Sequence, residues 1–263
     1  MSAIQTYVRT TAPRGRETEQ VGPFLATYSP GTAHPMLNYA IPDDGAKPVA
    51  AEIDALTAAF RRRDLLPRLE YFTDVAPDLE NLLVEAGYAL ERRVPLMTCG
   101  PADRLDRPVP AGIRLRAPES DDDFRRLRSA QNTAFGEPAE IGDDEVEKLK
   151  SGVEAGVRHL LAEDDGVVVG GGLALEVVDG TTEIAGIAVL EPYRGRGIAA
   201  ALTARLTRDV HEAGAHTAFL TPGDLGIGNV YARVGYRPAG ECVHLSAVAE
   251  PAKSRPTPGG TRP

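Results

Sequence analysis

The most informative part of the sequence is EPYRGRGIAA, residues 191–200, which joins an apolar strand-like run to an amphipathic helical repeat. Glycines at positions 195 and 197 let the backbone turn tightly and present several N–H groups to one point. That point lies at the N-terminus of the next helix, where unpaired donors and the helix dipole favour an anion. Arg194 and Arg196 can add cationic contacts to phosphate groups. We therefore expect this stretch to hold a diphosphate.

This phosphate loop differs from the two common types. It has no Gly-Lys-Ser/Thr ending, so it is not a P-loop. Gly195, Gly197 and Ala200 follow a run of hairpins and not a strand–helix–strand unit, so they are not a dinucleotide fingerprint either. Taken alone, the glycines are equally consistent with a plain helix start flanked by solvated arginines.

The residues on either side predict regular elements. Ile198, Leu202, Leu206 and Val210 recur every four residues, which indicates a helix over 198–213 that Gly214 ends as a left-handed cap. Three β-rich runs precede the stretch, over 157–166, 167–180 and 181–190. Asp-Gly turns separate them, which is typical of antiparallel hairpins.

Further elements complete an α+β pattern. Residues 112–117 alternate like a half-buried strand, and Ser120 can cap a helix whose buried side includes Phe124, Leu127 and Phe135. A second short helix is expected over 143–155, then a strand at 216–222, a helix near 228–234 and a strand at 240–248. The order βααβββαβαβ predicts one sheet covered by helices.

Two motifs in this half resemble the GNAT superfamily of N-acetyltransferases. Arg194, Gly197 and Ala199 match its acetyl-coenzyme A signature, R/Q-x-x-G-x-G/A, between a strand and a helix. Residues 229–236, NVYARVGY, resemble the family's N-x-x-x-Y-x-x-x-G-F/Y ending in slightly contracted form. The resemblance covers about 112–248. It implies a mixed, mainly antiparallel central sheet with helices on both faces, the acyl-CoA N-acyltransferase fold.

The resemblance also implies an activity: direct transfer of an acetyl group from acetyl-CoA, as co-substrate, to a primary amine. Tyr231 would be the general acid for the departing thiolate, since a phenol is neutral at pH 7; otherwise it is a core or surface tyrosine. Glu183 is the candidate base, with Glu176 as second choice, although a solvent-facing strand-end glutamate is at least as common. An N–H such as that of Val189 would stabilise the oxyanion.

The residues implied to bind the coenzyme fall into three sets. Backbone groups of one strand would pair with the pantetheine arm, amides of the phosphate loop would bind the diphosphate, and one asparagine would approach the pantetheine or the sulfur. These residues are Ile187, Ala188 and Val189; Arg194, Gly195, Arg196, Gly197, Ile198 and Ala199; and Asn229. The histidines have no metal-binding spacing with cysteines or carboxylates, so no metal is expected.

An internal repeat is visible at an offset of 148 residues. It matches Thr73 to Thr221, Asn81 to Asn229, and the pair Gly87-Tyr88 to Gly235-Tyr236. Chance could give these identities, but the order of predicted elements also agrees, which favours a degenerate duplication. In the first half, the phosphate loop falls on residues 43–49, with two acids and one glycine, and Leu83 falls on Tyr231. That half therefore looks like a copy without a cofactor loop or acid.

The predicted organisation is two related halves: a degenerate GNAT-like half over 1–100, a linker over 101–111, a catalytic GNAT domain over 112–249, and a disordered tail over 250–263. The length of 263 residues, about 1.75 times an ordinary domain, agrees with this division. Because a fused repeat can replace a partner subunit, a monomer is favoured over a homodimer.

Composition narrows the class and the partners. With 42% hydrophobic and 25% charged residues and no apolar run of bilayer length, the chain reads as a globular protein and not a membrane one. A net charge of −9 opposes binding to nucleic acid or anionic membrane. Two cysteines and no signal-like start suggest the cytoplasm.

The acceptor is harder to predict. Acidic residues in the segment expected to line its site suggest a small cationic amine, while a protein N-terminus or lysine stays open. A non-catalytic acyl-CoA-binding sensor or regulatory protein is the alternative function. The acidic residues are Glu137, Glu140, Asp143 and Asp144.

Overall fold

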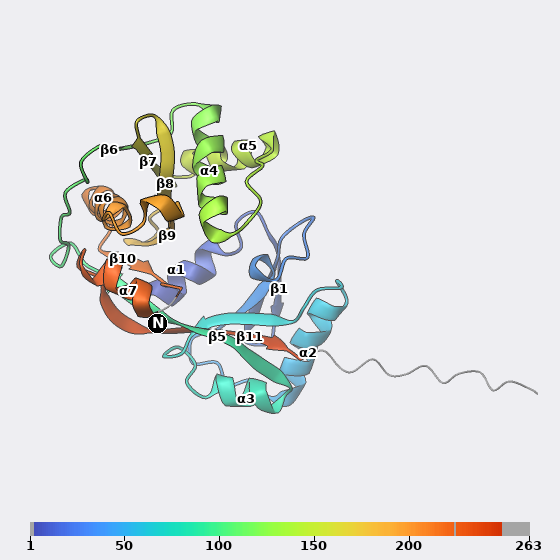
Figure 1. Cartoon of the computed structure of the whole chain (residues 1–263). Coiled ribbons are helices and arrows are strands. Elements are labelled where there is room, and N and C mark those ends of the chain that lie inside the picture. The colour runs from blue at the N-terminus through green and yellow to red at the C-terminus, as the bar shows by residue number, and fades with distance from the viewer. Residues whose placement is uncertain (1–2, 224, 249–263) are drawn as a thin grey trace, which may run out of the picture. The chain divides into compact units, whose positions relative to one another are not determined.

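The computed structural model describes residues 3–223 and 225–248 (Figure 1). The predicted tail at 250–263 lies outside these residues. The chain forms two compact units, each assembled from separate segments. Among the described residues, the first contains 3–14, Tyr71–Val75 and Arg93–Val243; the second contains Gly15–Glu70, Ala76–Arg92 and 244–248.

The first unit has the βααβββαβαβ order that the sequence predicts for the second half of the chain. It adds α1 and the end of β5 to these elements. Their bounds are α1 Ala3–Thr11, β5 Tyr88–Cys99, β6 Ile113–Arg116, α4 Asp121–Phe135, α5 Asp143–Glu154, β7 Arg158–Asp164, β8 Val167–Ala174, β9 Thr181–Val189, α6 Ile198–Glu212, β10 Thr217–Leu220, α7 Leu225–Ala232 and β11 Arg237–Ala247.

The sheet of the first unit is mixed and mainly antiparallel. Its strands lie in the order β11-β5-β10-β9-β8-β7-β6, with β9 and β10 parallel and the pairs β10–β5, β9–β8, β8–β7 and β7–β6 antiparallel. The hairpins turn where predicted, since Asp165-Gly166 and Asp179-Gly180 all have positive φ.

Helices α4 and α6 cover opposite faces of this sheet. A side chain at Gly171 of β8 would collide with Leu127 of α4, whereas one at the next residue, Gly172, would lie 3.3 Å from Leu206 of α6. Because successive residues of a strand point to opposite faces, the two helices lie on opposite sides. The paired glycines let both helices approach β8 closely.

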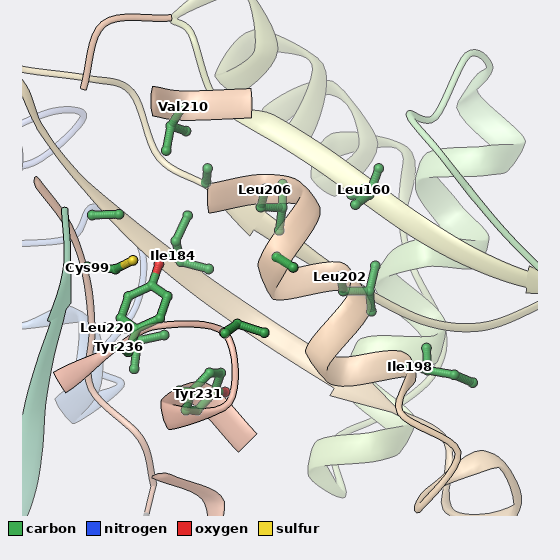
Figure 2. Close-up of a cluster of buried hydrophobic side chains, with 14 of the residues drawn as sticks. Cys99, Leu160, Ile184, Ile198, Leu202, Leu206, Val210, Leu220, Tyr231 and Tyr236 are labelled. Atoms are coloured by element: carbon green, nitrogen blue, oxygen red, sulfur yellow. The ribbon is translucent and has the colours of Figure 1, made fainter. Parts of the chain in front are cut away.

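The core under α6 follows the predicted four-residue repeat. Ile198, Leu202, Leu206 and Val210 are all buried and line one side of the helix in Figure 2. They pack in one cluster with sheet residues such as Ile184. Full burial of each large aliphatic side chain stabilises the fold by about 1.5–3 kcal/mol.

Helix α4 begins as predicted, but the prediction that its last residue is buried was wrong. The Ser120 side chain accepts a hydrogen bond from the Asp123 N–H at 3.2 Å, and Phe124 and Leu127 are buried. Phe135, which we expected on the buried side, is 57% exposed. Gly136 takes the left-handed conformation (φ 79°) and ends the helix, so Phe135 lies past the part of α4 that packs on the sheet.

The second unit repeats part of the first. Strands β1-β2-β3-β4 pair antiparallel, antiparallel and parallel, with α2 between β3 and β4. Strands β7-β8-β9-β10 pair in the same three ways, with α6 between β9 and β10. The elements of the second unit are β1 Glu17–Val21, β2 Phe24–Tyr28, β3 Tyr39–Pro42, α2 Ala50–Arg61, β4 Arg68–Phe72, whose last two residues belong to the first unit, and α3 Leu79–Glu85. The two halves of the chain are therefore related.

The halves exchange their last strands. The predicted offset places β5 on β11, yet β10 pairs with β5 through Ala218 opposite Cys99 and Leu220 opposite Met97. The end of β11 belongs to the second unit, where the Ala247 N–H donates to the Pro67 carbonyl at 2.9 Å. This exchange explains why each compact unit contains segments from both halves.

Candidate functional site

The predicted phosphate loop lies between β9 and α6 of the first unit. Gly195 and Gly197 have φ of 75° and 87°, a region that other residues enter only with strain. Within the described part of the chain, the N–H groups of residues 195–199 donate to no backbone carbonyl. The loop thus presents a row of donors at the N-terminus of a helix of 15 residues, which suits an anion.

The two arginines of the loop form hydrogen bonds with other parts of the first unit. Arg194 donates to the Val189 carbonyl at 3.0 Å and to the Ala134 carbonyl at 3.1 Å, so it joins the end of β9 to the end of α4. Arg196 donates to Asp164 at 2.8 Å and lies over the ring of Tyr193. These contacts use part of each guanidinium, and contact with phosphate stays a prediction for both.

A cavity of about 520 Å³ opens beside the loop. The structure brings together eight of the predicted coenzyme-binding residues in its wall: Ile187, Ala188, Val189, Arg194, Gly195, Gly197, Ile198 and Ala199. Arg196 and Asn229 are not in that wall, and Asn229 is exposed on α7. Six further lining residues were not among those predicted to bind the coenzyme: Ala134, Phe135, Tyr193, Ala200, Val230 and Arg233.

Strands β9 and β10 separate beside this cavity. They pair only from Thr181 opposite Thr217 to Glu183 opposite Phe219. Past Glu183, β9 continues to Val189 and, among the described residues, has β8 as its strand partner. Its other edge is therefore available to an extended ligand, which can pair with backbone groups as an added strand does.

An irregularity lies in β9 just past the fork. Gly186 has φ 60°, and the pairing of β8 with β9 changes register between Gly171 and Leu173. The buried side chain of Gln131, on α4, donates to the Gly186 carbonyl at 2.8 Å. This hydrogen bond turns that carbonyl toward α4 and fixes the local course of β9. No sequence signal singled out Gln131.

Tyr231 lies on α7 and is 8% exposed (Figure 2). Its ring packs edge-on to Tyr236, with centroids 6.3 Å apart, and Tyr236 in turn hydrogen-bonds Thr207 at 2.8 Å. Burial raises the pKa of Tyr231 above the usual 10.0, so the phenol is protonated at neutral pH. The preceding residue, Val230, lines the cavity, whereas Tyr231 is not part of its lining.

Helix α1 packs on β9 near the two candidate bases, a contact that no sequence pattern predicted. The hydroxyl of Tyr7 donates to the Glu176 carbonyl at 3.1 Å, and Arg14 forms an ion pair with the Glu176 carboxylate. Burial, and then the charge of Glu183, raise the pKa of Tyr7 to about 12. Glu183 is thus close enough to Tyr7 to act on it and stands at the last paired position of the fork.

Neither a metal-binding cluster nor a membrane-spanning helix is found among the described residues. They contain no group of three or more histidine, cysteine, aspartate or glutamate side chains that could hold a metal ion. None of their helices combines the length and hydrophobicity that a membrane span requires.

Comparison with known proteins shows what the chain is similar to. Residues 124–236 match the model of the acetyltransferase (GNAT) family. A GCN5-related N-acetyltransferase from Kribbella flavida is 27% identical, with a TM-score of 0.77 over 94% of this chain and 95% of that one. One from Sphaerobacter thermophilus is 19% identical, with a TM-score of 0.66 over 85% and 76%.

A third structure bears on the two halves. A tandem GNAT protein from the clavulanic acid biosynthesis pathway is 15% identical, with a TM-score of 0.64 over 94% of this chain and 87% of that one. At this identity the likeness concerns the fold alone. No curated protein matches the chain.

Proposed function

We propose that this chain, whose residues 124–236 match the model of the acetyltransferase (GNAT) family, transfers an acetyl group from acetyl-CoA to a primary amine. The carrying observation is the phosphate loop, where N–H groups that donate to no backbone carbonyl among the described residues lie at the N-terminus of α6 and are suited to an anion. The loop borders a cavity of about 520 Å³ lined mainly by apolar residues. A diphosphate joined to a long, partly apolar arm fits both features.

In this proposal the arm of the coenzyme lies along the edge of β9. Ile187, Ala188 and Val189 line the cavity and lie past the fork, so their backbone groups can pair with the amides of the arm. The amides of the phosphate loop bind the diphosphate at one end. The thioester then lies toward the fork between β9 and β10.

Tyr231 is the proposed general acid. Its raised pKa keeps the proton available, and a phenol can donate it where negative charge develops on the sulfur of the leaving thiolate. Asn229, two residues before Tyr231 on α7, is proposed to approach the pantetheine or the sulfur. An N–H of β9 is proposed to stabilise the charge on the carbonyl oxygen. Val189 stands at the phosphate-loop end of β9, so an N–H nearer the fork is better placed for this than that of Val189.

Glu183 is the proposed base that removes a proton from the attacking amine. Its place at the fork supports this role. Glu176 is the poorer candidate, because its carboxylate is already paired with Arg14.

The proposed acceptor is a small cationic amine, with a protein amine as the second possibility. Of the four acids in the loop after α4 and the start of α5, Asp143 pairs with Arg125 and Asp144 lies 3.9 Å from Lys148. Glu137 and Glu140 are therefore better placed to attract a cation. A library of amines assayed for release of free coenzyme A thiol identifies the acceptor.

Location and assembly are also proposals. Cys99 and Cys242 are both buried and are not joined in a disulfide, which agrees with a reducing cytoplasm. A monomer is proposed because the second half already contains a strand from the first. Light scattering of the purified protein measures its mass directly.

The test of the phosphate loop uses a pair of variants at Gly195. No atom lies within 4 Å of a side chain built there, and both Asp and Asn tolerate positive φ, so both variants are expected to fold. Gly195→Asp places a carboxylate against the diphosphate and should weaken binding of coenzyme A at least about tenfold in calorimetry. Gly195→Asn, of the same shape without charge, should bind far more tightly than Gly195→Asp. Equal affinity of the two variants contradicts the assignment.

Turnover separates an enzyme from the alternative, a non-catalytic acyl-CoA-binding protein. Binding of coenzyme A with no thiol release across the amine library would support the sensor. Release that depends on both acetyl-CoA and one amine supports the enzyme.

A further inference from the structure

Phe135 is a large apolar side chain that the fold leaves uncovered at the site. It is 57% exposed and lines the cavity together with Val189 and Arg194. A single exposed apolar residue is ordinary on a protein surface. An aromatic ring in the wall of a ligand-sized cavity has a more specific use, because a ligand can cover it.

The backbone holds this ring firmly in place. Past Phe135, the N–H of Gly136 donates to Thr133 and that of Glu137 donates to Asn132, at 3.2 and 2.8 Å. These two bonds form the usual closed end of a helix with a left-handed glycine. Before Phe135, the Ala134 carbonyl accepts a hydrogen bond from Arg194. The ring is therefore carried by a rigid helix end that is tied to the phosphate loop.

The position of the ring along β9 follows from two hydrogen bonds. Gln131, one helical turn before Phe135, contacts the carbonyl of Gly186 near the fork. Ala134 is joined through Arg194 to the Val189 carbonyl, at the phosphate-loop end of β9. From Gly186 to Val189 a strand advances about 10 Å. Phe135 thus stands beside the part of the cavity nearest the diphosphate, away from the thioester.

We propose that Phe135 packs against the apolar part of the pantetheine arm that adjoins the diphosphate, and so positions coenzyme A on β9. This inference rests on the proposed function. The arm carries a branched, methyl-bearing carbon next to the diphosphate, and an aromatic face is an apolar surface of suitable size for it. Phe135 is a positioning residue in this account, and it contacts neither the acyl group nor the amine.

Two ligands and one substitution test the contact. Calorimetry compares the wild type with Phe135→Ala, using coenzyme A and 3′-phospho-ADP, which has the diphosphate and adenosine but no arm. Loss of the ring should weaken coenzyme A binding about 5–10-fold and 3′-phospho-ADP binding less than about twofold. Steady-state kinetics should show a raised KM for acetyl-CoA with kcat nearly unchanged.

Each other outcome has a definite meaning. Equal weakening for both ligands means that the ring contacts the adenosine diphosphate part, which overturns the inference. No weakening for either overturns it as well. If the wild type binds neither ligand, the proposed function itself fails, and the inference fails with it. Thermal unfolding of Phe135→Ala should match the wild type, because the ring is mostly exposed.

An independent readout comes from the absence of tryptophan in the chain. Phe135→Trp introduces one fluorophore into the cavity wall, and its emission should shift to the blue when coenzyme A covers it. Val153→Trp, at an exposed position on α5 outside the cavity lining, is the control and should not respond. A blue shift with coenzyme A but not with 3′-phospho-ADP supports contact with the arm, whereas an equal shift with both overturns it.

Discussion

Tyr231 is buried beside Tyr236, and this burial keeps its phenol protonated. Replacing it by phenylalanine removes one oxygen and leaves the packing of the ring. Because general acids contribute about 100-fold or more, Tyr231→Phe should lower kcat by about that factor and leave coenzyme A affinity nearly unchanged. Stopped-time thiol-release assays and calorimetry give the two quantities.

The matched control for this change is Tyr236→Phe. Its hydroxyl bonds Thr207 and lies in the core, so its loss should reduce stability by about 1 kcal/mol without a comparable drop in kcat. Unchanged turnover of Tyr231→Phe would mean that water or another group is the acid and that Tyr231 is a core residue.

His159 gives a prediction for the pH dependence of stability. It is 7% exposed, and burial, with a smaller effect of Arg128, lowers its pKa from 6.5 to about 4. Below pH 6.5 the histidine of the unfolded chain therefore binds a proton, whereas the buried histidine of the folded chain stays neutral until about pH 4. His159 thus has no effect on the free energy of unfolding above pH 6.5 and lowers it progressively as the pH falls from 6.5 to about 4. At pH 5 the loss is about 2 kcal/mol.

Urea unfolding at pH 7.5 and pH 5 measures this loss. His159→Gln keeps a polar side chain that does not titrate, so its free energy of unfolding should fall by about 2 kcal/mol less than that of the wild type over the same interval. Other titrating groups act equally in both proteins and cancel. The same fall in both proteins would rule out His159 as the source.

At the scale of elements, periodicity and turns predicted the second half of the chain well. The four-residue repeat of α6, the Ser120 cap of α4 and the Asp-Gly hairpins are local features, and each element forms where its signal lies. The prediction that Phe135 is buried was wrong. Phe135 is part of α4, as expected, but it is the last residue of the helix and lies past the part that packs on the sheet. The hydrogen bonds of Gln131 and Tyr7 could not be predicted from local pattern, because their partners, Gly186 and Glu176, are distant in the sequence.

The irregular part of β9 should depend on Gly186. An alanine there has to keep φ near 60°, and its methyl group would lie 2.9 Å from the Gln131 amide nitrogen. Gly186→Ala should therefore lower the free energy of unfolding by more than the about 1–2 kcal/mol of left-handed strain alone. It should also weaken coenzyme A binding, since Ile187 and Val189 follow on the same strand.

Gly166→Ala is the control for this strain. Gly166 has φ 80° in the β7–β8 turn, with no atom within 4 Å of an added side chain. Chemical denaturation and calorimetry of both variants separate strain from the contact with Gln131. Equal losses of stability and intact coenzyme A binding would show that the course of β9 does not depend on that contact.

At the scale of the whole molecule, the repeat in the sequence predicted two related halves, but it did not predict which strands of one half pair with strands of the other. The offset of 148 residues aligned α2 with α6 and β4 with β10, as local pattern allows. It could not tell whether β5 stays with β4 or pairs with β10, because either neighbour satisfies the same hydrogen-bonding edge and the same alternation of side chains. Strand exchange is decided by long-range packing, which no local motif records.

This exchange predicts how the catalytic domain proposed over 112–249 behaves when it is made alone. That fragment lacks β5, whose residues Met97, Thr98 and Cys99 pair with β10, and it lacks α1, which packs on β9. The edge of β10 would be unpaired and its apolar neighbours uncovered, so the fragment should unfold without a cooperative transition or aggregate.

A longer fragment over 93–249 restores the part of β5 that pairs with β10 and should recover part of the cooperativity. Urea unfolding followed by circular dichroism compares both with the full chain. If the 112–249 fragment unfolds as sharply as the full chain and binds coenzyme A equally well, the strand from the first half is dispensable, and the linear division of the chain into domains is the better description.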